Sequence, residues 1–312
     1  MRRFLRMGKV LLSRPGWIAA AVLSVLALTT AGTSLYLTAP LERVAVEVPA
    51  PPSSARTAPR PKTLAASQPE IPPWPENRLE GRPAKELLLQ MLRAVDRVIR
   101  ESPCCTMTFH KQERIGGKLL PEQTYFMKVR HDPFAIYMRC LKPVTGRELI
   151  YAEGHYDNQV IGHPPGIARL LVPRLKVPPN SPLIMAESRH PINEAGLANM
   201  IRKMIHYREM DLADPDSITI LDRIKDADRL LWFRSTHVHP VFHPDRPLGE
   251  TEVLYDPQTR FPLRFTGYDR PAPGQKEKKL GERYAYDDLV LGAKLSAQDF
   301  DPANPRYEFH RF

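Results

Sequence analysis

The spacing of apolar residues along the chain predicts two amphipathic helices. Within residues 87–99, and again within residues 197–205, apolar side chains recur every three or four residues, which places them on one face of a helix. Pro83 suits the first turn of the first helix. The second helix is predicted over residues 193–210, with Asn193 as a candidate N-terminal cap.

In ten other segments the apolar period changes to two, and Gly, Pro or Asp bounds each segment. Such alternation predicts strands with one buried face. The segments are 106–113, 123–129, 134–140, 147–152, 158–162, 217–223, 230–238, 250–256, 261–268 and 281–289. Because short turns join most neighbours, the strands should pair antiparallel. The predicted fold class is therefore α+β with a large antiparallel sheet.

Residues 163–182 interrupt this pattern with six prolines among apolar residues, which excludes a central strand. We expect an ordered loop or lid there that lays apolar side chains over the sheet. These side chains belong to Ile167, Leu170, Leu171 and Val172.

An apolar run over residues 17–37 follows a basic flank, residues 1–16, that carries no acid. As a helix the run would rise about 30 Å, enough to cross a bilayer, and basic residues collect on the cytoplasmic side. The sequence therefore predicts a single-pass transmembrane anchor in the inner (cytoplasmic) membrane, with the C-terminal domain in the periplasm. The alternative is a cleaved signal peptide with its core at residues 18–28, and both export the same domain.

Composition separates a linker from a folded domain. The chain has 33 prolines in 312 residues, and they are dense in residues 38–83, where bulky apolar residues are scarce. That stretch predicts an extended spacer, and residues 84–312 have the length of one domain.

The net charge of +10 comes partly from the N-terminal flank, and elsewhere the basic residues are interleaved with acids. A solvated charged surface is the first interpretation, and attraction to anionic lipid is the alternative. We expect no nucleic acid partner for an exported domain.

Three cysteines, Cys104, Cys105 and Cys140, cannot all pair within one chain. Buried free thiols on strands are the first interpretation, and a bridge from Cys104 or Cys105 to Cys140 is the alternative in an oxidising compartment. The chain has no C-x-x-C motif, so thioredoxin-like chemistry has no support.

A histidine-rich segment ends one predicted strand. His237 and His239 would point to the same face, about 6.6 Å apart, and His243 or Asp245 could complete a metal site. The alternative is a strand that simply runs into a proline-rich loop. No G-x-S-x-G, H-E-x-x-H or P-loop motif occurs, so the sequence favours a non-enzymatic role without a cofactor. A metal-dependent hydrolase centred on His237 and His239 remains the alternative.

Basic side chains on adjoining strands, together with the segment Ser188-Arg189-His190-Pro191, predict a polar rim around an apolar cavity. Arg189 could hold a phosphate or a carboxylate, and the alternative is that Arg189 and His190 fix the loop before a helix. For the basic residues on the strands, cross-strand ion pairs are the alternative. The predicted rim residues are Lys128, Arg130, Arg139, Arg147, Arg189 and His190.

Several blocks of sequence resemble known bacterial proteins. The blocks are Phe109-His110-Lys111-Gln112-Glu113-Arg114 and residues 128–138, 146–151, 188–192 and 299–305. Over residues 85–310 the chain resembles an uncharacterised family of exported proteins, a domain of unknown function. More distantly it resembles the outer-membrane lipoprotein carriers (LolA/LolB-like superfamily). This resemblance implies a curved, half-barrel sheet packed on two or more helices, although the tether and proline-rich spacer depart from freely diffusing carriers.

The resemblance also implies an apolar partner, a lipid or the acyl chain of a lipoprotein, in the concavity of the sheet. The candidate lining residues are Phe126, Phe134, Ile136, Met138, Ile150, Trp232 and Phe265. The alternative is that these side chains fill a closed core. A structural or envelope-assembly protein that binds a protein partner is a further hypothesis.

Overall fold

The computed structural model describes residues 71–163, 174–226, 229–271, 274 and 277–310. The chain divides into two compact units, Met1–Leu64 and Ala65–Phe312, and all described residues belong to the second. The predicted membrane span at 17–37 and the four apolar residues of the predicted lid lie outside the described residues. No helix in the described part of the chain is long and apolar enough to span a bilayer.

Two long helices form where the apolar spacing predicts them. Helix α2 spans Arg82–Arg100 and α5 spans Leu197–Ala213, while α4, Pro182–Met185, is a single short turn. The predicted cap of α5 is wrong: Gly196 is the N-cap residue, at φ 97°, a left-handed value that glycine adopts without strain. Asn193 instead lies in the preceding short 3-10 helix η2, Ile192–Glu194.

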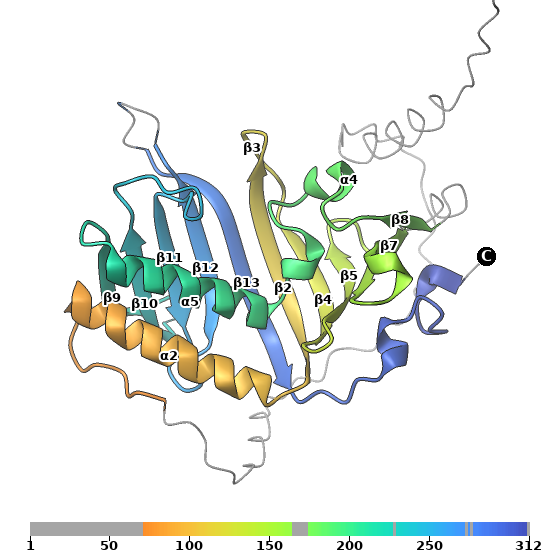
Figure 1. The fold of residues 1–312 in the computed structure, drawn as a ribbon, viewed down its shortest axis with the longest axis horizontal. Helices are drawn as coiled ribbons and strands as arrows, with labels where there is room; N and C mark the ends of the chain where they lie inside the picture. Colours follow the sequence, from red (N-terminus) through yellow and green to blue (C-terminus); the bar gives the residue numbers. More distant parts are fainter. Residues whose placement is uncertain (1–70, 164–173, 227–228, 272–273, 275–276, 311–312) are drawn as a thin grey trace, which may run out of the picture. The chain divides into compact units, whose positions relative to one another are not determined.

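All ten predicted strands are present, and three short ones join them. The strands are β1 Leu79–Glu80, β2 Cys104–Ile115, β3 Lys118–Leu119, β4 Gln123–Arg130, β5 Ala135–Lys142, β6 Glu148–Ala152, β7 Val160–His163, β8 Leu175–Val177, β9 Ile218–Lys225, β10 Leu231–Val238, β11 Glu250–Tyr255, β12 Pro262–Asp269 and β13 Lys279–Leu291. They form one open antiparallel sheet in the order β1-β9-β10-β11-β12-β13-β2-β4-β5-β6-β7-β8, with β3 paired to β2 (Figure 1). The prediction of a large antiparallel sheet with few helices is confirmed.

The sheet consists of two meanders that meet at β2 and β13. Strands β2 to β8 form one half and β9 to β13 the other, and Phe109 of β2 pairs with Tyr286 of β13 across the junction. Helix α5 lies in the connection from the edge strand β8 to β9, on the far side of the sheet, so it must cross the sheet.

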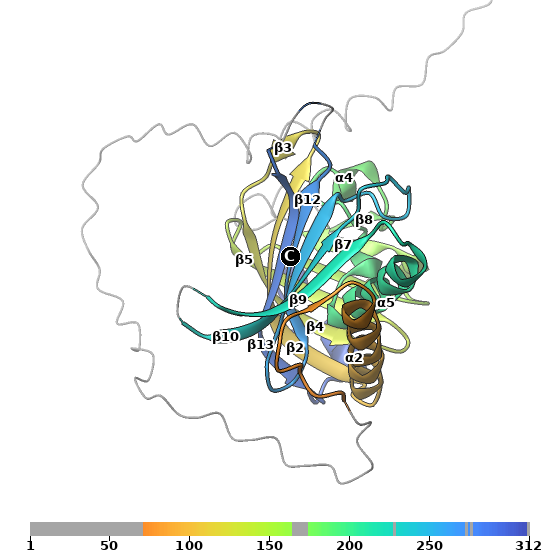
Figure 2. The same cartoon turned by 90° about the vertical axis from the view of Figure 1, so that its left-hand side faces the viewer.

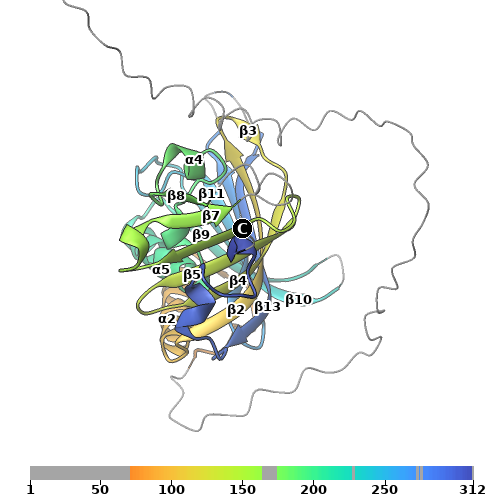
Figure 3. The same ribbon diagram turned by 90° about the vertical axis from the view of Figure 1, so that its right-hand side faces the viewer.

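Each face of the sheet is covered by a different part of the chain. Helices α2 and α5 lie against one face, the helix face (Figure 2). The C-terminal segment, residues 292–310, lies against the opposite face beside β5, and we name this the tail face (Figure 3). The segment includes the short helices η3, Ala297–Phe300, and η4, Glu308–His310.

Packing of the domain begins before the predicted end of the linker at residue 83. The indole of Trp74 stacks on Phe233 with ring centroids 3.9 Å apart, and its Nε1 donates to the carbonyl of Pro257. Leu79 and Glu80 pair with β9. The segment is held further by hydrogen bonds from Arg223 to the carbonyl of Pro75 and from the N–H of Gly81 to the carbonyl of Thr219, so residues 71–81 pack as part of the domain.

Candidate functional site

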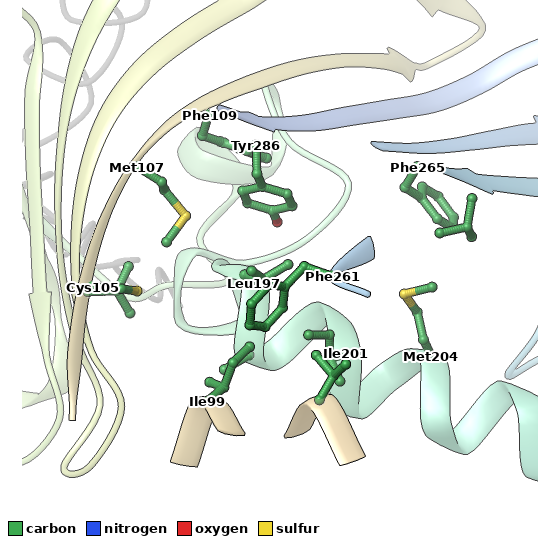
Figure 4. Close-up of a cluster of buried hydrophobic side chains, with 14 of the residues drawn as sticks. Ile99, Cys105, Met107, Phe109, Leu197, Ile201, Met204, Phe261, Phe265 and Tyr286 are labelled. Atoms are coloured by element: carbon green, nitrogen blue, oxygen red, sulfur yellow. The ribbon is translucent and has the colours of Figure 1, made fainter. Parts of the chain in front are cut away.

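A continuous apolar layer lies between the helix face and the two long helices (Figure 4). Leu88 and Ile99 of α2 and Leu197 and Ile201 of α5 are at most 1% exposed, because each helix turns one apolar stripe inward. The sheet side of the layer contains Cys105, Met107, Phe109, Met127, Val129, Ile136, Met138, Phe261, Phe265 and Tyr286.

Methionines form a row across the helix face of the sheet. Met107 of β2 pairs with Met127 of β4, which pairs with Met138 of β5, so the three side chains stand side by side on one face. Met91 of α2 and Met204 of α5 are buried in the same layer. Unbranched thioether side chains change shape at low cost and suit surfaces that adapt to different apolar partners.

The seven predicted lining residues lie on both faces of the sheet. Ile136, Met138 and Phe265 are buried in the layer on the helix face, and Phe134 packs at its margin. The other three lie elsewhere: Phe126 and Ile150 belong to the apolar cluster of the tail face, and Trp232 bonds through its indole to Asp226. Adjacent residues of a strand point to opposite faces, and apolar residues cover both faces of β4 to β6.

Three of the predicted rim residues hold the C-terminal segment instead of lining a cavity. Lys128 Nζ lies 2.7 Å from Asp299 Oδ1 and donates to the hydroxyl of Tyr307. Arg130 lies over the ring of Phe300, and Arg139 approaches Glu308 at 3.8 Å. Lysine and arginine on the tail face therefore act as anchors for the segment.

A buried carboxylate, Glu148, joins this segment to the sheet. Tyr137 donates to Glu148 Oε1 at 2.7 Å, while Oε2 contacts His163 Nε2 at 2.9 Å and accepts the backbone N–H of Glu308 at 2.8 Å. Burial alone would raise the pKa of Glu148, but the hydrogen bonds from His163 and Tyr137 lower it overall. The ring of Tyr307 stacks on Tyr137 at 4.0 Å.

The other three predicted rim residues lie on the side of the helix face, two of them at the buried Glu282 and the third at Glu187, which is partly exposed. Arg189 and His190 each contact Glu282 at 3.1 Å, and Arg147 contacts Glu187 at 2.8 Å. Burial alone would raise the pKa of Glu282, but His190 and Arg189 lower it overall.

The second buried glutamate of this cluster is Glu113, which pairs with Glu282 across β2 and β13. It accepts from Tyr284 at 2.6 Å and from the backbone N–H of Arg189 at 3.1 Å. Ion pairs and hydrogen bonds to Glu113 and Glu282 thereby hold the loop before η2 on the sheet. For Arg189 and His190, the arrangement agrees with the alternative that they fix the loop before a helix.

His237 and His239 are buried together, but their neighbours differ from those of a metal site. His239 Nε2 lies 3.0 Å from Asp211 Oδ1, and His237 Nδ1 shares a hydrogen bond with Thr219. His243 is 45% exposed and pairs with Asp245. Among the described residues, no group of three or more His, Cys, Asp or Glu side chains is arranged to hold a metal ion.

Asp211, on α5, is the centre of a charged network that sequence reasoning missed. It is fully buried and contacts Arg208, Arg246 and His239. Burial alone would raise the pKa of Asp211, but Arg208 and His239 hold it well below its usual range. A signal did exist: Arg208 and Asp211 continue the helical spacing of the buried stripe of α5.

The three cysteines are free and buried, as the first interpretation had it. Cys105 belongs to the apolar layer, where burial raises the pKa of its thiol to about 12. The side chain of its neighbour Cys104 points to the other face, because adjacent strand residues alternate.

A family model covers most of this domain. Residues 103–309 match the model described as a protein of unknown function (DUF1571). The chain belongs to this family. The predicted membership of an uncharacterised family is confirmed, and among curated proteins a sequence search finds no match to the chain.

Solved structures similar to the chain come from several bacteria. A DUF1329 family protein from Desulfovibrio piger is 13% identical, with 70% of this chain and 97% of that chain covered and a TM-score of 0.36. The lipoprotein LppX of Mycobacterium tuberculosis is 10% identical, with 69% of this chain and 99% of that chain covered and a TM-score of 0.38. A LolA superfamily protein of Nitrosomonas europaea is 10% identical, with 67% of this chain and 95% of that chain covered and a TM-score of 0.26. Likenesses at these scores carry no inference about function.

Proposed function

We propose that the protein is a non-enzymatic, membrane-anchored exported protein that holds an acyl chain of a lipid or lipoprotein between the helix face and helices α2 and α5. Residues 17–37 would anchor it in the inner membrane, and residues 38–70 would carry the domain into the periplasm. The observation that carries the proposal is the methionine row, Met107, Met127 and Met138, inside the apolar layer.

The way α5 is attached to the sheet supports this function. Its buried charged contacts to other elements gather near its C-terminal end, where Asp211 meets His239 and Arg246, while the partly exposed Lys203 contacts the loop residues His190 and Glu194. Its N-terminal half, residues 197–204, meets the sheet through apolar side chains. Apolar contacts have no fixed direction, so this half can shift to admit a guest while the other end stays fixed.

The energetics suit an acyl guest. Each buried methylene contributes about 0.8 kcal/mol, so a chain of moderate length offsets the cost of rearranging a few methionine side chains. The C-terminal segment covers the tail face over β5 to β7, so in this half of the sheet the guest would lie on the helix face.

The proposal is tested by quantifying the lipids that remain with the full chain after gentle detergent extraction. In a variant, Ala198→Leu, extra side-chain volume is placed in the layer on α5, where Ala198 is 6% exposed. The matched control is Ala213→Leu, at an exposed position of the same helix. We expect mass spectrometry to find acyl lipid with the wild type and the control, and several-fold less with Ala198→Leu.

Overpacking costs about 1–3 kcal/mol, so urea unfolding must show that the Ala198→Leu variant is still folded. Absence of acyl lipid from the wild type over a range of mild detergents would contradict the proposal.

A further inference from the structure

The buried stripe of α5 changes from apolar to charged along its length. Leu197, Ile201 and Met204 lie in the apolar layer, and Arg208 and Asp211 continue the same face of the helix. Arg208 is 3% exposed. A guanidinium group therefore lies buried where the apolar layer ends.

Positive charge exceeds negative charge at this end of the layer. The buried cations are Lys85, Arg208 and Arg246, and the acids that face them are Asp211 and Asp214. Burial, followed by the nearby Arg208, lowers the pKa of His237 well below its usual value, so His237 adds no charge at neutral pH. The network thus carries at least one positive charge that no described acid balances.

The hydrogen bonding of Arg208 is incomplete in the same way. A guanidinium offers five N–H groups. Nη2 of Arg208 lies 3.0 Å from Asp211 Oδ2, an ion pair in which Oδ2 accepts no hydrogen bond from any described residue. Nε and Nη1 are buried and have no acceptor among the residues that the structure describes. Buried donors without acceptors cost about 1–3 kcal/mol each, more where the group is charged, and native proteins rarely leave them so.

We propose that Arg208 binds the carboxylate of a fatty acid whose chain lies in the apolar layer. This inference rests on the proposed function and names its ligand class. A carboxylate supplies the missing acceptors as a charge-assisted hydrogen bond. Its single negative charge matches the imbalance of the network, whereas a phosphate dianion would bring a second charge into a buried site at high desolvation cost.

The distance along α5 fits such a ligand. From Arg208 to Leu197 the helix rises about 17 Å, and the buried stripe between them leads towards the methionine row on β2, β4 and β5. The head group would lie beside Tyr255, which is fully buried; burial raises the pKa of its hydroxyl, and the nearby Arg208 opposes that rise.

The test compares palmitate, hexadecanol and hexadecyl phosphate, which share a sixteen-carbon chain, by isothermal titration of the delipidated full chain in detergent. We expect the wild type to bind palmitate at least about tenfold more tightly than hexadecanol, a factor that corresponds to about 1.4 kcal/mol, and more tightly than the phosphate. Arg208→Met keeps the length of the side chain and removes its charge, and the preference for palmitate should fall to near one. The control is Arg202→Met, at an exposed position of α5, and it should keep the preference.

Each result separates this inference from the function on which it rests. If the wild type binds palmitate and hexadecanol equally, or if Arg208→Met keeps the preference for palmitate, Arg208 does not bind the carboxylate. Water then accepts the hydrogen bonds of its free N–H groups, and the proposal that the protein binds an acyl chain stands. A preference for hexadecyl phosphate assigns the site to phosphate head groups and overturns the carboxylate. Failure of all three amphiphiles to bind overturns both proposals.

Discussion

Substitution of Asp211 tests the charged network that fixes the C-terminal end of α5. The change Asp211→Asn keeps the shape of the side chain and removes the negative charge. Asp211 is fully buried and contacts Arg208 at 3.0 Å and His239 at 3.0 Å, and it also bonds Arg246. Without it, Arg246 keeps only Asp214, which is partly exposed, and Arg208 keeps no acid among the described residues.

The cost of this change follows from burial. Removal of one partner from a buried ion pair costs about 3–5 kcal/mol, because the other charge stays buried without compensation. Against a total stability of about 5–15 kcal/mol, that loss is roughly a fifth or more. Because Arg208 is the surplus cation, Arg208→Met should cost far less, and in the Asp211→Asn background it should restore part of the lost stability.

Urea unfolding of the full chain in detergent, followed by circular dichroism at pH 7, measures these effects. Asp216→Asn is the matched control, because Asp216 is exposed, and its unfolding free energy should stay within about 0.5 kcal/mol of the wild type. If Asp211→Asn costs less than about 1 kcal/mol, or if Arg208→Met costs as much as Asp211→Asn, the described charge balance is wrong.

Three further predictions concern the C-terminal segment and the domain boundary. Lys128→Met removes the ion pair with Asp299 and should cost about 1.5–3 kcal/mol and expose residues 292–310 to limited proteolysis, whereas Lys142→Met, at an exposed position, should do neither. Because the folded-state pKa of Glu148 is lowered, its stabilising contribution is present above about pH 4.3, the ordinary pKa of a glutamate, and is lost as the pH falls through the folded value. Glu148→Gln should be less stable at pH 7 yet show a flatter decline below pH of about 4 in urea midpoints, and an equally steep decline would refute the assignment. Trp74→Ala, which removes the ring stacked on Phe233, should lower stability by about 1–3 kcal/mol; an unchanged melting temperature would mean that residues 71–81 do not belong to the folded domain.

The elements of the fold could be predicted from the sequence because their periodicities are long and well bounded. Strand β4 alternates buried and half-buried residues over its whole length, and α2 repeats its apolar stripe over five turns. Strands β1, β3 and β8 span only two or three residues, too few for a period to show. The cap of α5 was missed because a glycine with positive φ leaves no side-chain signal.

The side to which each residue points was harder to predict than the element that carries it. Residues 135–138 of β5 are all buried, since helices cover one face and the C-terminal segment the other. A strand covered on both faces has a continuous run of apolar residues. The sequence therefore did not show that the side chains of Ile136 and Ile150 lie on opposite faces of the sheet. The partners of the tail-face rim residues could not be predicted either, because Lys128 meets Asp299 only through the return of the distant C-terminal segment.

The charged network depends on contacts between residues far apart in the chain. Asp211 meets His239 and Arg246 because α5 crosses the sheet and ends over β10. The spacing of α5 predicted that residues 208 and 211 face inward, but only the fold shows which charges they find there.

Labelling of two neighbouring cysteines tests the central claim, that an acyl chain lies on the helix face of the sheet. Cys105 belongs to the apolar layer and Cys104 points to the opposite face. Each is left as the single thiol of the full chain by serine substitutions at the other two positions, and its labelling by an apolar maleimide is followed with and without palmitate. Palmitate should slow labelling of Cys105 several-fold and leave that of Cys104 unchanged; equal protection of both thiols, or of neither, would contradict a guest in the layer.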